Sequence, residues 1–307
     1  MAVIGIDLGG TKVAAAIFHA DGKMLLKETK LLDGATGEKV ADLIVEVVNS
    51  LIEQKNDVHI DAVGICIPGI VYSKKDTVWA PNIPGWDNFP LKAHLEKGLG
   101  REDIKIFIES DRTCYILGEV WKGAAKGCTD AIYLAVGTGI GAGILLDGRI
   151  IHGSNDIVGA TGWMALENPY THEWDQCGCF ETYASGNGIG YQAKKLYRDN
   201  TKSSYDVFAG YGKDPIATEI LDKAIQMWGM GAANLVSLFN PEKVIFGGGI
   251  FGPAVQFIPR IYKEACKWGQ PISMKEVKFC ASAIDGEAAL LGATALALRA
   301  INPLEYE

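Results

Sequence analysis

The sequence predicts an α/β protein with two lobes, each built around a mixed β-sheet. The chain has 307 residues, of which 48% are hydrophobic, and this is enough to bury two separate cores. Residues 4–17 and 132–145 share an outline of apolar strand, Gly/Thr turn and apolar strand, which indicates two related halves. Elsewhere strand and helix patterns alternate, so we expect antiparallel hairpins and parallel strands to share one sheet in each lobe.

The first half should begin with the hairpin at residues 4–17, whose turn needs glycine because glycine adopts positive φ freely and lets a ligand approach the backbone. Residues 38–54 predict an amphipathic helix, since apolar side chains recur there at helical spacing. A second helix should begin at about Asp111, where a carboxylate suits the free N–H groups of a first turn. The remaining strands are expected at residues 23–32, 62–67 and 104–109.

The second half repeats this scheme after its own hairpin. Residues 161–188 are rich in Trp, Gly, Pro and Cys, and we expect them to form a long functional loop or an insertion. The first lobe should comprise residues 1–111 completed by 298–307, and the second lobe residues 112–297. Helices are expected at residues 215–239, 254–268 and 287–299, with strands at 244–246 and 277–280.

Composition limits the partners of the chain. The net charge is −8 and the sequence has no basic cluster, so neither nucleic acid nor an anionic membrane is an expected partner. The start of the chain lacks the regions of a secretory signal, and no apolar stretch is long enough to cross a bilayer. Seven scattered cysteines do not resemble a disulfide framework. We therefore expect a soluble protein of the cytoplasm that acts on a small molecule.

The turn of the first hairpin combines a carboxylate, two glycines, a hydroxyl and an ammonium group. Such a set can surround phosphate oxygens with N–H donors and a cation. The alternative is a tight hairpin turn without a ligand, because glycine is common at turns. The residues concerned are Asp7, Gly9, Gly10, Thr11 and Lys12.

Two further glycine clusters each follow a predicted strand. The run at residues 137–143 leads into another strand rather than a helix, which argues against a dinucleotide-binding fingerprint. Residues 247–249 are all glycine. Together with the first turn, these clusters could enclose one nucleotide.

These motifs resemble the ROK family, which comprises sugar kinases and sugar-responsive repressors on the actin-like ATPase (ribonuclease H-like) fold. The resemblance covers nearly the whole chain, and it implies ATP and Mg²⁺ as cofactors, a sugar or cyclitol as substrate, and a homodimer. Its specific segments are DLGGTK at 7–12, CIPGIV at 66–71, APNIPGW at 80–86, ESD at 109–111, GTGIGAG at 137–143, CFETYASG at 179–186 and NPEKVIFGGG at 240–249.

The resemblance also implies roles for single residues. Asp111 is the expected catalytic base, and phosphoryl transfer to a hydroxyl group needs such a base in any case. Its alternative role is a helix N-cap. ATP contacts fall on Asp7, Gly9, Gly10, Thr11, Lys12, Gly137, Thr138, Gly139, Gly141, Gly248 and Gly249. Substrate contacts fall on Gly69, Asn82, Ser110, Asp111 and Glu181; for Asn82 a turn residue and for Glu181 a solvated loop carboxylate are the alternatives. Trp163, which departs from the family pattern, is a further candidate substrate contact.

Two family motifs are altered in this chain. Relatives carry Glu-x-Gly-His where this sequence has residues 160–163, ATGW, so both side chains that grip the sugar are missing. An indole binds no metal, and the zinc motif keeps only part of its pattern. His172, Cys177 and Cys179 are weak candidates for a rearranged site, and we expect no structural zinc. The loop would instead be held by aromatic packing, with Trp163 in the core, along the substrate, or both.

We therefore expect an ATP-dependent kinase that phosphorylates a hydroxyl group, the primary one, of a hexose or a sugar-like polyol. A repressor would need a DNA-binding segment, and only six residues precede Asp7 in the sequence. A catalytically weak sugar or nucleotide sensor derived from such a kinase is the remaining alternative.

Overall fold

The structure, a computed structural model, describes residues 1–284 and 286–302. Backbone contacts divide the described chain into two compact units. Among the described residues, the first unit contains Met1–Lys126, His152–Ile157 and residues 286–302, and the second contains the others. Compared with the expected lobes, this division assigns residues 112–126, 152–157 and 286–297 to the first unit; residues 303–307, expected to complete that lobe, lie outside the described residues.

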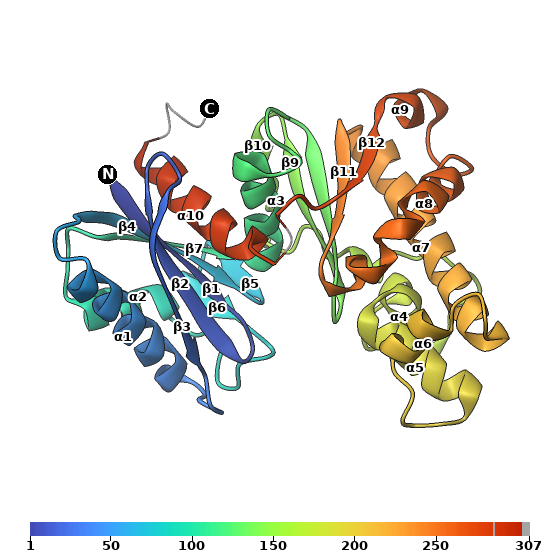
Figure 1. Cartoon of the computed structure of the whole chain (residues 1–307), viewed down its shortest axis with the longest axis horizontal. Helices are drawn as coiled ribbons and strands as arrows, with labels where there is room; N and C mark the ends of the chain where they lie inside the picture. The colour runs from blue at the N-terminus through green and yellow to red at the C-terminus, as the bar shows by residue number, and fades with distance from the viewer. Residues whose placement is uncertain (285, 303–307) are drawn as a thin grey trace. The chain divides into compact units, whose positions relative to one another are not determined.

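The first unit is built on a five-stranded mixed sheet in the order β3-β2-β1-β4-β7 (Figure 1). The hairpin joins β1 to β2 antiparallel, and β4 and β7 continue the sheet parallel to β1. The carboxyl ends of β1, β4 and β7 therefore lie at one edge of the sheet. The strand bounds are β1 Ala2–Leu8, β2 Lys12–His19, β3 Met24–Leu31, β4 Ile60–Ile67 and β7 Lys105–Ser110.

Helices cover both faces of this sheet. The helices α1 (Glu38–Gln54) and α2 (Leu91–Leu99) share a buried apolar cluster with alternate residues of β1, such as Ile4 and Ile6. Side chains of a strand alternate between the two faces, and the intervening Gly5 faces α10 (Ala288–Ile301) instead. The helix α3 (Asp111–Lys122) packs against α10.

Glycines let α10 approach its neighbours closely. A Cβ atom added to Gly64 in β4 would lie 1.9 Å from the carbonyl oxygen of Ala293. One added to Gly292 would lie 1.7 Å from the carbonyl oxygen of Cys114 in α3. This close packing holds both α3 and β4 against α10.

The second unit repeats the same plan, as the internal sequence similarity predicted. Its sheet has the order β10-β9-β8-β11-β12, in which β8 and β9 form the antiparallel hairpin and β11 and β12 run parallel to β8. The expected α/β class with a mixed sheet in each half is thereby confirmed. The strand bounds are β8 Ala131–Val136, β9 Ile140–Leu146, β10 Arg149–Ile150, β11 Lys243–Gly247 and β12 Lys278–Ala281.

The helix α7 (Pro215–Phe239) is the central helix of the second unit, with one face in the main apolar cluster. Its bounds agree with the prediction: the Asp214 carboxylate caps its start and Asn240 ends it with left-handed backbone. The other elements of this unit are α4 Cys179–Ala184, α5 Gly186–Tyr197, α6 Ser204–Gly210, α8 Ile258–Ala265, α9 Pro271–Glu276 and the 3₁₀ helices η1 Thr161–Trp163, η2 His172–Trp174, η3 Gly249–Phe251 and η4 Pro253–Phe257.

Several expected elements differ in the structure. The predicted helix at 254–268 is divided into η4 and the shorter α8, because Pro259 has no N–H group for an uninterrupted helix. The loop expected at 161–188 contains η1, η2 and α4. The helix α2 and the hairpin of β5 (Ile70–Tyr72) and β6 (Thr77–Trp79) were not predicted, since short elements carry little periodic signal.

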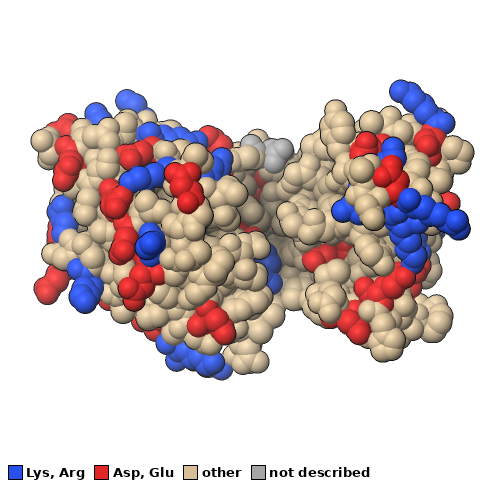
Figure 2. Space-filling view, turned by 90° about the horizontal axis from the view of Figure 1, so that it is seen from below, with Lys and Arg blue, Asp and Glu red and all other residues tan. Residues whose placement is uncertain are grey.

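No helix among the described residues is both long and apolar enough to cross a membrane. On the surface of the first unit in view, acidic and basic side chains are interspersed (Figure 2). Ion pairs of this unit include Lys27 with Glu287 and Lys30 with Glu46.

Candidate active site

The first unit gathers chemically active residues at the carboxyl ends of its parallel strands. In the pairing register Asp7 lies opposite Cys66, and Cys66 lies opposite Glu109. Asp111 follows directly after β7 as the first residue of α3. The structure thus brings Asp7 and Asp111 to one sheet edge, where the negative charge of Asp7 helps to raise the pKa of Asp111.

Asp111 lies half-buried at the strand-to-helix corner. Its Oδ1 accepts a hydrogen bond from the N–H of Arg112 at 2.8 Å. Burial is the main cause that raises the pKa of Asp111 from 3.8 to about 6, and the charge of Asp7 adds to it while Arg112 opposes it. A carboxylate with this pKa can accept a proton near neutral pH.

Ser110, and not Asp111, is the N-cap of α3. The buried Ser110 hydroxyl accepts from the N–H of Thr113 at 3.4 Å and bonds the Thr113 hydroxyl at 3.1 Å. The N-cap alternative for Asp111 is therefore wrong. Its carboxylate is left for another role, while Ser110, a predicted substrate contact, has a structural one.

The first glycine turn is closed by a hydrogen bond from the N–H of Gly9 to the carbonyl of Lys12 at 2.9 Å. Gly10, Thr11 and Lys12 are exposed, so their backbone and side chains are accessible to a ligand. Burial raises the pKa of Asp7, against which the charges of Lys12 and Lys27 act. Carboxylate and ammonium groups thus meet at this turn, as the sequence predicted.

Asn82 lies beside this turn, because a Cβ on Gly10 would be 3.5 Å from the Asn82 Cβ. The exposed Asn82 belongs to a loop held by Trp86, whose indole N–H donates to the carbonyl of Gly37 at 2.9 Å. Trp86 is buried and stacks on Phe89. The sequence motif contained Trp86, but its anchoring role depends on the distant Gly37 and was not predicted.

Gly69 has a packing reason to be glycine. A Cβ there would lie 1.9 Å from the carbonyl oxygen of Trp79 in β6. Its N–H donates to the carbonyl of Ile67 at 3.0 Å. Its place beyond the end of β4 nevertheless puts it at the same sheet edge as Asp7 and Asp111.

In the second unit, Glu181 of α4 holds the turn between β8 and β9. Its Oε2 accepts from the N–H of Ile140 at 2.6 Å, and Cβ atoms on Gly139 or Gly162 would lie 2.7 and 2.8 Å from this oxygen. Burial raises the pKa of Glu181, and the Ile140 N–H group acts in the opposite direction. Glu181 is therefore not a solvated loop carboxylate, and this contact was missed because residues 41 apart in sequence form it.

The remaining predicted phosphate contacts surround the same turn. Thr138 is exposed, and a Cβ on Gly137 or Gly249 would meet no atom within 4 Å, so their backbones border open space. Gly248 has a φ of 86°, and a Cβ there would lie 2.6 Å from the carbonyl oxygen of Val136. Gly141 differs from the others because it lies inside β9, paired with Ala135.

Trp163 and the weak zinc candidates are spread out in the structure. The Trp163 side chain is 59% exposed, so it does not replace the missing metal in the core, whereas Trp174 and Phe180 are buried there. His172 Nδ1 lies 3.1 Å from Asp175 Oδ2, and Cys177 Sγ lies 3.4 Å from Thr182 Oγ1. No group of three potential His, Cys, Asp or Glu metal ligands occurs within residues 1–284 and 286–302.

Two buried thiols below Asp111 also escaped prediction. Cys66 of β4 and Cys114 of α3 are hydrogen-bonded to each other and fully buried. The contact with Cys114 and burial raise the pKa of Cys66 well above its usual value. These neutral thiols form an apolar layer beneath the β7–α3 junction that carries Asp111. The only feature of the sequence that could have predicted it is the helical spacing of residues 111 and 114, which places Cys114 on the same face of α3 as Asp111.

Comparisons with known proteins agree with this arrangement. A family model described as "ROK family" matches residues 3–300. A glucokinase of Thermotoga maritima is 29% identical over 96% of both chains. The structure resembles the ROK hexokinase of Thermus thermophilus, with a TM-score of 0.85, 29% identity and coverage of 99% of this chain and 100% of the other.

A second solved structure adds information on ligands. It is a ROK family glucokinase from Streptomyces griseus in complex with glucose and AMPPNP, with a TM-score of 0.74, 28% identity and coverage of 97% and 99% of the two chains. A xylose repressor of Caldicellulosiruptor bescii and a solved ROK family transcriptional regulator are also among the matches.

Proposed function

The chain belongs to the ROK family and is a carbohydrate kinase, and from this premise we propose that it transfers the γ-phosphoryl group of ATP to a hydroxyl group, the primary one, of a hexose or a sugar-like polyol. The observation that carries the proposal is the half-buried Asp111 at the carboxyl end of β7, next to Asp7 and with a pKa raised to about 6. The resemblance to a glucokinase solved with AMPPNP supports ATP as the donor.

Asp111 acts as the general base in this proposal. It accepts the proton of the acceptor hydroxyl while the oxygen attacks the γ-phosphorus, the bond to the β-phosphate oxygen breaks, and ADP leaves. Ser110 caps the helix and so keeps the Asp111 backbone in place. A positioned base contributes about 10² to 10⁴ in rate.

The glycine turns provide the donor site. Exposed backbone at Gly10 and Thr11 in the first unit, and at Thr138 and Gly249 in the second, offers N–H groups to phosphate oxygens, and Lys12 adds a cation. The N–H groups of Gly9 and Gly137 close the two turns and so fix their shape. The carboxylate of Asp7 fits Mg²⁺, which is bound in such enzymes through one or two carboxylates and the phosphates. When bound, Mg²⁺ would neutralise phosphate charge.

The acceptor is proposed to contact Asn82, Gly69 and Glu181, with Trp163 as an exposed wall. Asn82 has an exposed amide beside the first turn, and Glu181 keeps Oε1 for an acceptor hydroxyl because its Oε2 binds Ile140. Ala160 and Trp163 replace the family's gripping Glu and His, so the C1–C2 end of the acceptor should differ from the usual one.

The test is ADP release measured with MgATP across hexoses, amino sugars, ketoses and cyclitols, followed by ³¹P NMR to locate the new phosphate ester. We expect at least one acceptor to raise turnover well above ATP hydrolysis in its absence. If none does, the kinase proposal fails.

The second candidate is a catalytically weak sensor, which the loss of Glu and His at 160–163 favours. It would bind a sugar or nucleotide in calorimetry without ADP release above background. The homodimer and the cytoplasmic location also remain predictions; analytical ultracentrifugation tests the first.

A further inference from the structure

The segment His152–Ile157 belongs to the first unit, although the residues on both sides of it belong to the second. Polar contacts attach it to the turn of the β5–β6 hairpin. The backbone N–H of Ser73 donates to Asp156 at 3.0 Å, the Ser73 hydroxyl bonds both Asp156 oxygens, and Lys74 Nζ donates to the carbonyl of Ser154 at 2.7 Å. These contacts hold the segment but do not reach the catalytic corner.

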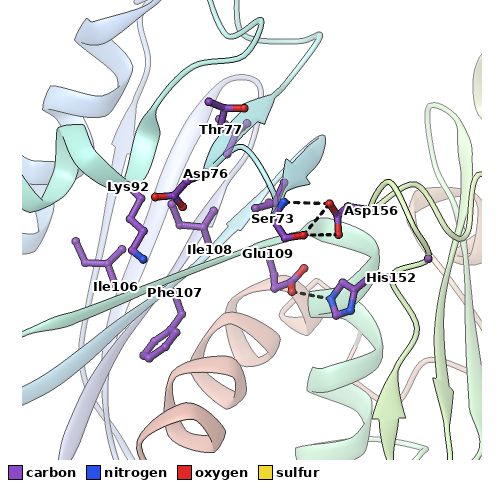
Figure 3. Close-up of a pocket in the computed structure, with 13 residues that line it drawn as sticks. Ser73, Asp76, Thr77, Lys92, Ile106, Phe107, Ile108, Glu109, His152 and Asp156 are labelled. Atoms are coloured by element: carbon purple, nitrogen blue, oxygen red, sulfur yellow. Dashed lines mark hydrogen bonds and ion pairs between the residues drawn. The ribbon is translucent and has the colours of Figure 1, made fainter.

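His152 makes a different contact, as Figure 3 shows: its imidazole faces the carboxylate of Glu109 at the end of β7. His152 Nε2 lies 2.8 Å from Glu109 Oε1. The other oxygen, Glu109 Oε2, accepts from the backbone N–H of Ser110 at 3.3 Å. A continuous series of hydrogen bonds therefore joins His152 to the backbone of Ser110.

Ser110 is the last residue of β7 and the N-cap of α3, and Asp111 is the first residue of that helix. The position of the Asp111 carboxylate consequently depends on how firmly the Ser110 backbone is held. Glu109 is restrained mainly on one side, because a cavity of about 490 Å³ adjoins it. This cavity is also lined by Val71, Val78, Lys92, Ile106 and His152. Without His152, the Glu109 side chain has room to rotate into the cavity.

We propose that His152 is a positioning residue for phosphoryl transfer, which acts through Glu109 on the Ser110–Asp111 corner. The inference rests on the proposed role of Asp111 as the base. Displacement of a reacting group by about 1 Å can lower a rate about 10²-fold. The helix cap at Ser110 remains when His152 is lost, so a smaller effect, about tenfold on kcat, is expected. The KM for ATP should stay unchanged, because the series of hydrogen bonds from His152 leads through Glu109 to Ser110 and not to the glycine turns.

The experiment compares steady-state kinetics of variants with the best acceptor of the wild-type protein. His152→Ala should lower kcat about tenfold, whereas His152→Gln, whose amide can place a donor near the former Nε2, should restore kcat to within about threefold. Ser73→Ala weakens the other attachment of the same segment and should leave kcat within about twofold. The His152→Ala, Glu109→Ala double variant should lose no more than the worse single variant, because both break one series of contacts.

A wild-type kcat in His152→Ala would overturn the inference. Equal decreases in kcat for Ser73→Ala and His152→Ala would also overturn it, and so would a double variant whose decrease in kcat is the product of the two single decreases. Melting temperatures within about 2 °C of the wild type would show that a variant has lost activity and not its fold. If His152→Ala unfolds, the comparison passes to His152→Gln. A His152→Gln variant that folds but is as inactive as His152→Ala counts against the positioning role. If the wild type and Asp111→Asn phosphorylate no acceptor, the proposed function and this inference both fail. If only Asp111→Asn is inactive while His152→Ala is normal, the inference alone fails.

Discussion

Replacement of Asp111 by asparagine should stabilise the folded chain at neutral pH. Burial raises the pKa of Asp111 from its usual 3.8 to about 6, so the folded state binds the proton more tightly than the unfolded state does. The ionised group then costs the folded state about 3 kcal/mol above pH 6, because one pKa unit corresponds to about 1.4 kcal/mol. Asparagine has a similar shape without the charge, and its oxygen can still accept from the N–H of Arg112.

The pH dependence makes this prediction specific. The cost is fully present above about pH 6, decreases as the pH falls towards 3.8, and is absent below it. Thermal unfolding should therefore show a Tm several degrees higher for Asp111→Asn than for the wild type at pH 7.5, and nearly equal values at pH 4. The control is Asp103→Asn: Asp103 is exposed and a hydrogen bond from Arg101 lowers its pKa, so its replacement should not raise the Tm. An Asp111→Asn variant that is no more stable than the wild type at pH 7.5, or equally stabilised at both pH values, would refute the reasoning.

Three further predictions concern Asp111, Glu181 and Gly69. The kcat/KM for the acceptor should fall below about pH 6, to about a tenth of its plateau at pH 5, as Asp111 is protonated; a plateau that extends below pH 5 would show that another group is the base. Glu181→Ala leaves the N–H of Ile140 without its partner and should raise the KM for ATP several-fold, whereas Glu181→Gln keeps an acceptor oxygen and should do so less; an effect on the acceptor KM alone would contradict a role of Glu181 in holding the turn. Gly69→Ala places a Cβ against the carbonyl of Trp79 and should lower the free energy of unfolding by about 1–3 kcal/mol in urea titrations, and an unchanged midpoint would count against the packing seen here.

Elements with strong periodicity and clear caps could be predicted from the sequence. The helix at Glu38–Gln54 has its apolar residues at helical spacing, and Pro215–Phe239 is bounded by Asp214 and Asn240. The helix expected at 254–268 failed because its apolar pattern continues past Pro259, where the backbone lacks a donor. Periodicity alone does not record that loss.

The parts of the candidate site that lie at strand ends or in sequence motifs could be predicted. Asp7 lies near the carboxyl end of β1 and Asp111 directly follows β7, a strand of the same parallel set, so their proximity follows from topology. The N-cap of α3 is Ser110 and not the adjacent Asp111, and sequence patterns do not locate a helix boundary to within one residue. The contact of Glu181 with Ile140 and that of His152 with Glu109 join distant segments, and no local pattern indicates such pairs.

Phosphoryl transfer by the wild type and by Asp111→Asn, compared at saturating MgATP with the best acceptor, tests the central claim most directly. A direct binding measurement of ATP to both proteins should accompany it, to show that the donor site is intact. The account predicts a kcat lower by about 10² to 10⁴ for Asp111→Asn, with ATP affinity nearly unchanged. A variant that keeps the wild-type kcat would contradict the assignment of Asp111 as the base.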